Sequence, residues 1–190
     1  MEFFLQAARI NHSCNSNSHR HWNSRIEKLT IHAKRHIKAG EEITISYMGP
    51  MVHKDRQRIS QGNFGFVCDC TCCSLPETEK VATDRAVSIM TRAISGSLLG
   101  RGKKPMHQLL KMLQAAANLA INDNRLPNNG LNSILEAAVE VSIYHKDGFR
   151  SLAFSNYAYM VRKTLDGEDS QQMLNLKQST GTIDAAMCQK

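Results

Sequence analysis

Four of the six cysteines in this 190-residue chain are crowded into one short segment, CDCTCC, which spans residues 68 to 73. Three of them have the spacing C-x-C-x-x-C, which allows a single loop to place three sulfur atoms around one ion. Zinc in structural sites takes four ligands in a tetrahedron, with zinc–sulfur bonds of about 2.3 Å. The fourth ligand must then come from elsewhere in the chain. The alternative is a group of buried free thiols, which the polar residues between the cysteines disfavour.

Cys14 is the natural candidate for the fourth ligand. It lies in the segment RINHSCNSNSH, residues 9 to 19, which has three asparagines, three serines and two histidines but almost nothing apolar after its second residue. This composition is not typical of a core, and it fits a polar loop, half of a metal site or part of a ligand pocket. Cys72 would be the spare thiol, although exchange with Cys73 remains open. We therefore predict one zinc site formed by Cys14, Cys68, Cys70 and Cys73.

The composition sets limits on compartment and partners. The chain is 42% hydrophobic with a net charge of +7, but it has no block of Lys and Arg longer than three residues. A solvated basic surface is the simpler interpretation and an acidic partner is the alternative, while specific nucleic-acid binding is not expected. No apolar run approaches the roughly 20 residues that cross a bilayer, and no signal peptide opens the chain. We expect an intracellular protein of the nucleus or cytoplasm, away from membranes, with reduced cysteines.

The region between the two cysteine-bearing segments is predicted to form strands. Apolar and polar residues alternate in residues 29 to 33 and again in residues 43 to 47, and Ala39-Gly40 supplies a turn between these two runs. The adjacent residues Glu41 and Glu42 would face opposite ways on a strand, so they are not interpreted as an acid–base pair. SHRHWN, residues 18 to 23, is interpreted as a solvated loop and not as a second metal site.

Short helices are expected on either side of these strands. The first ten residues, MEFFLQAARI, fit a short helix with Phe3, Phe4, Ala7 and Ile10 on its apolar side. DRQRISQ, residues 55 to 61, fits a helix that is capped by its first residue and ended by the glycine at position 62. The segment NFGFVCDC then leads two phenylalanines directly into the cysteines.

Three of these motifs together resemble one family. RINHSCNSN, AKRHIKAGEEITISY and FGFVCDCTCC, in this order and at these spacings, look like the C-terminal half of a SET domain followed by its cysteine-rich post-SET segment. SET domains are protein lysine methyltransferases, and the arginine-bearing helix before the last motif is most similar to the SET-and-MYND subfamily. The resemblance covers residues 1 to about 75. It departs from the family pattern at Ser16, where proline is usual.

The resemblance implies roles for individual residues. Asn11 is expected at the amino acid end of S-adenosylmethionine, the backbone of His12 at the edge of the adenine, and Phe66 near the adenine and the lysine channel. Tyr47 matches the tyrosine that lines the methyl-transfer pore, and Cys14 matches the cysteine that completes the post-SET zinc site. Each residue also has a structural alternative, as a turn or cap residue, a strand-end aromatic or a core side chain.

Whether the chain is itself an active enzyme is left open by the resemblance. A complete SET domain begins with a Gly-x-Gly segment that holds the methionine end of the cofactor, and the matching region here starts after that point. The strands that remain would also expose unpaired edges. We therefore expect the 190-residue chain to bind S-adenosylmethionine weakly or not at all.

The sequence beyond residue 75 is predicted to be helical. Apolar residues recur at helical spacing in residues 78–97, 107–121, 131–144 and 149–165, with breaks at GRGKKP, NNG and two Asp-Gly pairs. The core should include Leu109, Leu113, Ala117, Leu135, Val139, Leu152 and Val161. These helices resemble the tetratricopeptide-like C-terminal region of SET-and-MYND proteins, although no clean 34-residue repeat is present. Residues 179–190 are expected to be a frayed tail.

The sequence thus predicts an α+β chain with three parts: a partial β-rich SET and post-SET module with a zinc site (residues 1–75), a helical domain (residues 76–178) and a tail (residues 179–190). The expected function is S-adenosylmethionine-dependent methylation of a lysine in a histone or another protein. The alternative is a non-catalytic module that binds zinc and uses its helical domain to contact a protein partner.

Overall fold

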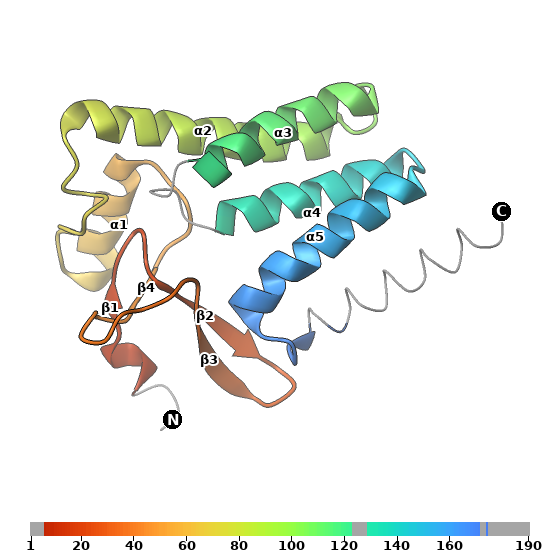
Figure 1. Cartoon of the computed structure of the whole chain (residues 1–190). Coiled ribbons are helices and arrows are strands. Elements are labelled where there is room, and N and C mark those ends of the chain that lie inside the picture. The colour runs from red at the N-terminus through yellow and green to blue at the C-terminus, as the bar shows by residue number, and fades with distance from the viewer. Residues whose placement is uncertain (1–5, 123–128, 172–173, 175–190) are drawn as a thin grey trace.

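The computed structural model describes residues 6–122, 129–171 and 174 (Figure 1). Within these residues, small sheets and one α-helix come first and four long helices follow, so the described part of the chain is a mixed α and β structure. The N-terminal residues expected to start a helix, including Phe3 and Phe4, lie outside the described residues apart from a single 3₁₀ turn at Ala7–Arg9. The predicted tail at 179–190 also lies outside them.

A short parallel pair of strands brings two distant motifs together. β1 (Asn11–His12) pairs with β4 (Thr44–Ile45), so that Asn11 lies opposite Thr44 and His12 opposite Ile45. β4 is shorter than the predicted strand at 43–47. The turn that precedes it contains Gly40 with φ of +81°, a conformation that glycine adopts without steric cost. This pairing places the NHSC motif directly beside the segment that leads to Tyr47.

An antiparallel hairpin forms the second sheet, and it corrects one sequence prediction. β2 (Ser18–Asn23) pairs with β3 (Lys28–Ala33), and Ser18 lies opposite Ala33. The interpretation of residues 18–23 as a solvated loop was therefore wrong. The segment is a polar strand whose two histidines, His19 and His21, lie against the buried carboxylate of Asp166 at the end of the last helix.

The helix before the post-SET cysteines also differs from its predicted bounds. α1 spans His53–Phe64, starts two residues before Asp55 and continues through Gly62. Its start is held by a tertiary contact, since the backbone N–H of His53 donates to Asp84 Oδ1 at 2.7 Å. Gly65, with φ of +75°, ends the helix in the left-handed conformation. The end position matters because it directs Phe66 and the cysteines back toward β1.

Four helices pack into a layered bundle beside the sheets (Figure 1). They are α2 (Glu77–Gly100), α3 (Met106–Asn122), α4 (Asn129–Tyr144) and α5 (Gly148–Asp166), each close to its predicted range. Of the predicted core residues, Leu109, Leu113 and Leu135 are buried, while the other four are half-buried. The buried core comprises Ala86, Val87, Met90, Ala93, Leu109, Leu113, Ala116, Ile134, Ala137, Ala138 and Val141. None of the helices in the described ranges is long and apolar enough to span a bilayer.

The C-terminal end of α5 lies against the β2–β3 hairpin. Asp166, which is 3% exposed, accepts a hydrogen bond from Arg162 Nη1 at 2.6 Å. Its other oxygen lies 3.7 Å from His19 Nε2 and 3.4 Å from His21 Nδ1. One buried carboxylate therefore joins the hairpin to the helical bundle.

Candidate functional site

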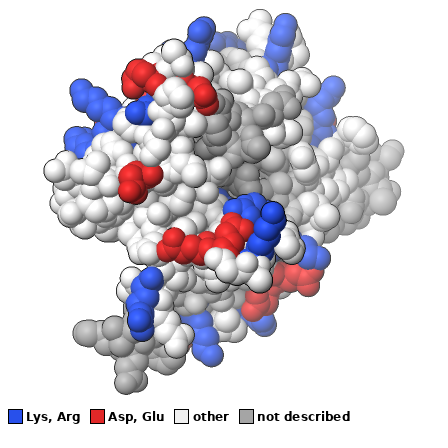
Figure 2. Space-filling view, turned by 60° about the vertical axis from the view of Figure 1, so that its left-hand side comes forward, with Lys and Arg blue, Asp and Glu red and all other residues white. Residues whose placement is uncertain are grey.

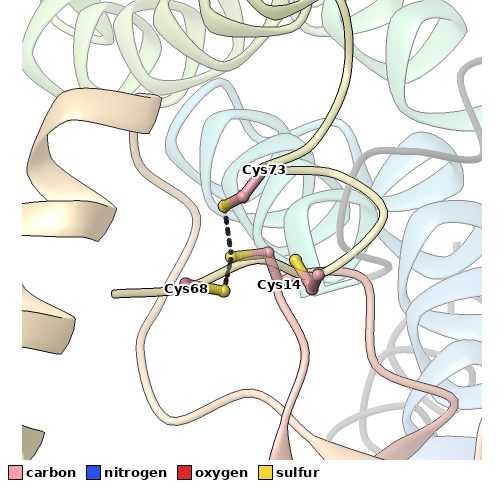
Figure 3. A group of neighbouring side chains, drawn as sticks. Cys14, Cys68 and Cys73 are labelled. Carbon is pink, nitrogen blue, oxygen red and sulfur yellow. Dashed lines mark hydrogen bonds between the residues drawn. The ribbon is translucent and has the colours of Figure 1, made fainter. Parts of the chain in front are cut away.

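Four cysteine sulfurs converge between the N-terminal strands and the loop after α1. The sulfurs of Cys14, Cys68, Cys70 and Cys73 all lie within 4.8 Å of one another. Figure 3 shows the Cys14 sulfur between those of Cys68 and Cys73, at 3.9 Å and 3.6 Å. A tetrahedron with zinc–sulfur bonds of about 2.3 Å has sulfur–sulfur edges of about 3.8 Å. The cluster is therefore compatible with one zinc ion without rearrangement.

The loop of residues 68–73 is shaped locally to present its thiols. The backbone N–H groups of Cys73 and Ser74 both donate to the carbonyl oxygen of Cys70, at 2.8 and 2.9 Å. The side chain of Gln57 on α1 forms two hydrogen bonds with the backbone of Cys68. Its Nε2 donates to the Cys68 carbonyl at 2.7 Å, and its Oε1 accepts from the Cys68 N–H at 3.0 Å. These bonds fix the loop against α1 and aim its sulfurs at Cys14.

Cys72 is buried but lies outside the four-sulfur group. Its sulfur accepts a long hydrogen bond from Arg56 Nη2 at 3.7 Å. Arg56 Nη1 donates to the Met51 carbonyl at 2.6 Å. Arg56 is itself buried, and Asp84 on α2 lies 3.8 Å from its guanidinium. A buried positive charge beside several thiols favours thiolate character in the cluster, which is the form that binds metal.

The thiols already differ in acidity. Hydrogen bonds from Cys14 and Cys73 favour the thiolate of Cys70 and lower its pKa. The same bonds hold the proton on Cys14 and raise its pKa. Burial raises the pKa of Cys68 to about 12. A metal-free cluster would thus concentrate negative charge at Cys70.

His12 joins the sulfur cluster to Tyr47. The backbone N–H of Tyr47 donates to His12 Nδ1 at 3.1 Å, so that nitrogen is an acceptor and the neutral ring carries its proton on Nε2. Nε2 lies 3.3 Å from the Cys14 sulfur and donates to it. Burial lowers the pKa of His12, which favours this neutral form. The imidazole therefore acts as a rigid link between the two.

Three aromatic rings surround Tyr47. Its ring centroid lies 5.1 Å from that of His12, 5.0 Å from Phe64 and 6.3 Å from Phe66. The Tyr47 hydroxyl donates to the carbonyl oxygen of Ile10 at 2.6 Å. Because the proton of the hydroxyl is used in this bond, its oxygen can act only as an acceptor toward any further group. Beside these rings is a cavity of about 310 Å³ lined by Ala7, Ala8, Arg20, Leu29, Ile45, Tyr47 and Phe64.

The polar residues of the NHSCNSN motif hold the two segments in register. Asn17 is buried; its Nδ2 donates to Glu41 Oε1 and to the Glu42 carbonyl, and its Oδ1 accepts from the Thr44 N–H at 2.9 Å. Asn11 is exposed and donates to Glu42 Oε1 at 2.6 Å. Both glutamates thus serve as structural acceptors, as the sequence suggested.

The structure brings together most of the predicted site residues and adds others. His12, Tyr47 and Phe66 share one ring cluster next to the four cysteines, whereas the side chain of Asn11 is directed to Glu42. Sequence reasoning did not include Phe64, which packs on Tyr47 and lines the cavity. The signal was present in the Phe-Gly-Phe spacing, since the glycine turns the chain and brings two rings to one side.

Comparison with known proteins shows what this region is similar to. Residues 3–48 match the SET domain. Histone-lysine N-methyltransferase set5 of Schizosaccharomyces pombe is 44% identical over 75 residues, which is 39% of this chain and 24% of that protein. SET5 of Scheffersomyces stipitis is 32% identical over 110 residues, covering 57% of this chain and 21% of the relative.

A mouse relative extends the similarity into the helices. Histone-lysine N-methyltransferase SMYD3 of Mus musculus is 29% identical over 141 residues, which is 70% of this chain and 32% of SMYD3. The chain is thus similar in sequence to SET5 and SMYD3 proteins, and it spans between about a fifth and a third of the length of these three relatives.

Proposed function

We propose that residues 1–75 form the C-terminal half of the active site of an S-adenosylmethionine-dependent protein lysine methyltransferase. The observation that carries this proposal is the ring cluster around Tyr47, which borders a cavity and is tied through His12 to a cysteine cluster suited to zinc. Relatives of this region are named histone-lysine N-methyltransferases. The substrate is accordingly a lysine of a histone or another protein, and the protein acts in the nucleus or cytoplasm.

The zinc ion has a structural role in this proposal. Cys14, Cys68, Cys70 and Cys73 would hold it, with all four positions of the tetrahedron filled by sulfur and none left for substrate. The ion would fasten the NHSC segment to the loop after α1, two segments more than fifty residues apart. The aromatic wall that includes Phe66 comes from the same loop, so the metal also fixes that wall against Tyr47.

Methylation of lysine places a specific demand on the pocket. When bound, S-adenosylmethionine supplies an electrophilic methyl group on a sulfonium. The lysine amine must be neutral to react, and since its ordinary pKa is near 10.4, this costs about 5 kcal/mol at pH 7. The rings of Phe64 and Phe66 exclude water and so disfavour the ammonium form. The Tyr47 hydroxyl, held by Ile10, offers an acceptor that orients an amine N–H.

The cofactor would lie against the NHSC segment. We assign Asn11, His12 and Phe66 to this contact, with the His12 backbone at the adenine edge, and Tyr47 as the catalytic residue. The His12 side chain then has a second task, because its Nδ1 holds the Tyr47 backbone at 3.1 Å. Cofactor contact and pore geometry are thereby coupled through one residue.

The helical region, residues 76–178, completes the proposal as a separate domain. Its antiparallel helix pairs support a tetratricopeptide-like arrangement that offers a surface to a protein partner. Basic and acidic side chains are both scattered over the face seen in Figure 2, which supports a role without specific nucleic-acid binding. A zinc-binding interaction module without catalysis is the alternative, and it predicts no dependence of any methyl transfer on Tyr47.

A chimeric enzyme tests the catalytic assignment. The segment of this chain that aligns with the fission yeast relative over 75 residues replaces its counterpart in that protein, and transfer of tritiated methyl groups to histones is measured. The proposal expects an active chimera, with Tyr47→Phe lowering turnover on the order of tenfold to a hundredfold, as expected for one lost oriented hydrogen-bonding group. A folded, zinc-loaded chimera without activity would contradict it, and so would full activity with Tyr47→Phe. Ser74→Ala is the matched control.

A further inference from the structure

A second cavity lies next to Tyr47 and differs in character from the first. It has a volume of about 200 Å³ and is lined by Ser16, His19, Arg20, Lys34, Ser46, Tyr47, Met48 and Gly49. Arg20 and Tyr47 contribute to both cavities, so the two spaces adjoin. The first cavity is bordered mainly by apolar and aromatic groups. The second has one lysine, one arginine, one histidine and no carboxylate in its lining.

Lys34 contributes a positive charge to this second cavity that no neighbouring carboxylate neutralises among the described residues. Its side chain is half-buried, and within the described part of the chain no carboxylate forms an ion pair with it. Loss of water around the amine and, to a smaller extent, the nearby charge of Arg35 together lower its pKa to about 8. A half-buried ammonium group beside other cations is costly unless an anion neutralises it.

The other polar groups of the cavity do not supply that anion. Asp166 touches His19, but it is already engaged by Arg162. The hydroxyls of Ser16 and Ser46 donate to the backbone carbonyls of Ser18 and Met48. Lys34 and Arg20 are therefore the free donors in this lining, and the cavity would select a ligand group by its negative charge.

We propose that this cavity is an anion subsite that takes a carboxylate or phosphate group on the protein substrate, close in sequence to the lysine that is methylated. The inference rests on the proposed function, because only then does Tyr47 mark the position of the target lysine. The size of the cavity suits one such group. A nucleic-acid backbone is disfavoured, since it needs a continuous basic track, whereas the basic side chains in Figure 2 are scattered over the face together with acidic ones.

Peptide binding to the zinc-loaded full chain, without cofactor, tests the subsite separately from catalysis. The probes are fluorescein-labelled peptides with one central lysine flanked by glutamates, by phosphoserines or by glutamines, and anisotropy gives their Kd. We expect the two anionic peptides to bind about tenfold more tightly than the glutamine peptide, as for one charge-assisted hydrogen bond. Lys34→Gln and Arg20→Gln should each remove most of this preference. Lys38→Gln, at an exposed lysine of the following loop, should leave it unchanged.

A chemical readout covers the case in which none of the peptides binds. Inorganic phosphate should then slow acetylation of Lys34 by acetic anhydride, followed by mass spectrometry, and leave that of Lys38 unaffected. Four results would each contradict the proposed subsite. Two concern the peptides: equal binding of all of them, or an equal loss of the charge preference in Lys34→Gln and Lys38→Gln. The others are the absence of both peptide binding and phosphate protection, and stronger competition by a short oligonucleotide than by the anionic peptides. An inactive chimera with an intact charge preference would refute only the methyltransferase function, and an active chimera that methylates all peptides equally would refute only the subsite.

Discussion

His12 is the residue on which the geometry of the site depends most. Its two ring nitrogens bind the Tyr47 backbone and the Cys14 sulfur, so the orientation of the pore residue follows from that of the metal cluster. Groups that hydrogen-bond metal ligands typically change metal affinity by 10- to 100-fold when they are removed. The ring is thus expected to influence zinc binding and turnover together.

Replacement of His12 by phenylalanine isolates its hydrogen bonds. The new ring keeps the aromatic contacts with Tyr47 and Phe66 but cannot donate to Cys14. We expect zinc affinity, measured by competition with a chromogenic chelator, to fall roughly 10- to 100-fold with little change in helix content. His36→Phe, at an exposed histidine, is the control and should bind zinc like the unmodified chain. An unchanged affinity in His12→Phe would rule out the Nε2–sulfur bond.

Cys70 and Cys72 are separated by one residue but have different environments. Cys70 belongs to the four-sulfur group, whereas Cys72 faces Arg56 outside it. Cys70→Ser should therefore abolish stoichiometric zinc, measured by elemental analysis, and loosen the loop after α1, because metal binding and local folding are coupled. Cys72→Ser should keep one zinc per chain. Zinc retained in Cys70→Ser but lost in Cys72→Ser would show that Cys72 is the ligand.

At the scale of elements, α3 packs against both α2 and α4. Leu113 is 2% exposed and packs among residues of α2 and α4. Leu113→Ala should lower the free energy of unfolding by about 2–5 kcal/mol, the usual cost of such a deletion in a core. Leu99→Ala is the matched control, since Leu99 is 80% exposed and its truncation should change stability by less than about 0.5 kcal/mol. Urea unfolding followed by circular dichroism measures both.

The helices were predictable from sequence, while β2 and the start of α1 were not. Apolar spacing identified α2 to α5 because each buries one side against its neighbours, and that periodicity is local information. β2 has no apolar alternation, and its two histidines lie against Asp166, more than 140 residues away. α1 likewise starts where Asp84 of α2 caps it. Both elements depend on tertiary polar contacts that spacing along the chain does not reveal.

The same distinction applies to the site. The cysteine cluster was predictable, because zinc imposes a ligand number and a spacing on the sequence. The positions of Tyr47 and Phe66 could be expected only through family resemblance. The link through His12 and the contribution of Phe64 depend on ring orientations that follow from the β1–β4 pairing and from the turn at Gly65. These features need the folded chain.

At the scale of the whole molecule, Asp166 couples the SET-derived hairpin to the helical bundle. The buried carboxylate contacts His19 and His21 on β2 and is anchored by Arg162 on α5. Arg162 also pairs with Glu136 on α4. A chain of polar contacts therefore runs from α4 through α5 into the hairpin, and it ends at the cationic cavity that His19 borders.

The contact between His19 and Asp166 should make the stability of the molecule depend on pH. Burial lowers the pKa of His19 below its ordinary 6.5, outweighing the attraction of Asp166, while Lys34, His21 and His32 add further opposition to a charged ring. Above about pH 6.5 the ring is neutral in both the folded and the unfolded chain. As the pH falls through 6.5 the unfolded chain takes up a proton that the folded chain resists, so stability decreases. Urea midpoints at pH 7.5 and 5.5 should show this loss, and His19→Gln should reduce it, whereas His36→Gln should not. A loss of the same size in His19→Gln as in the unmodified chain would place the titrating group elsewhere.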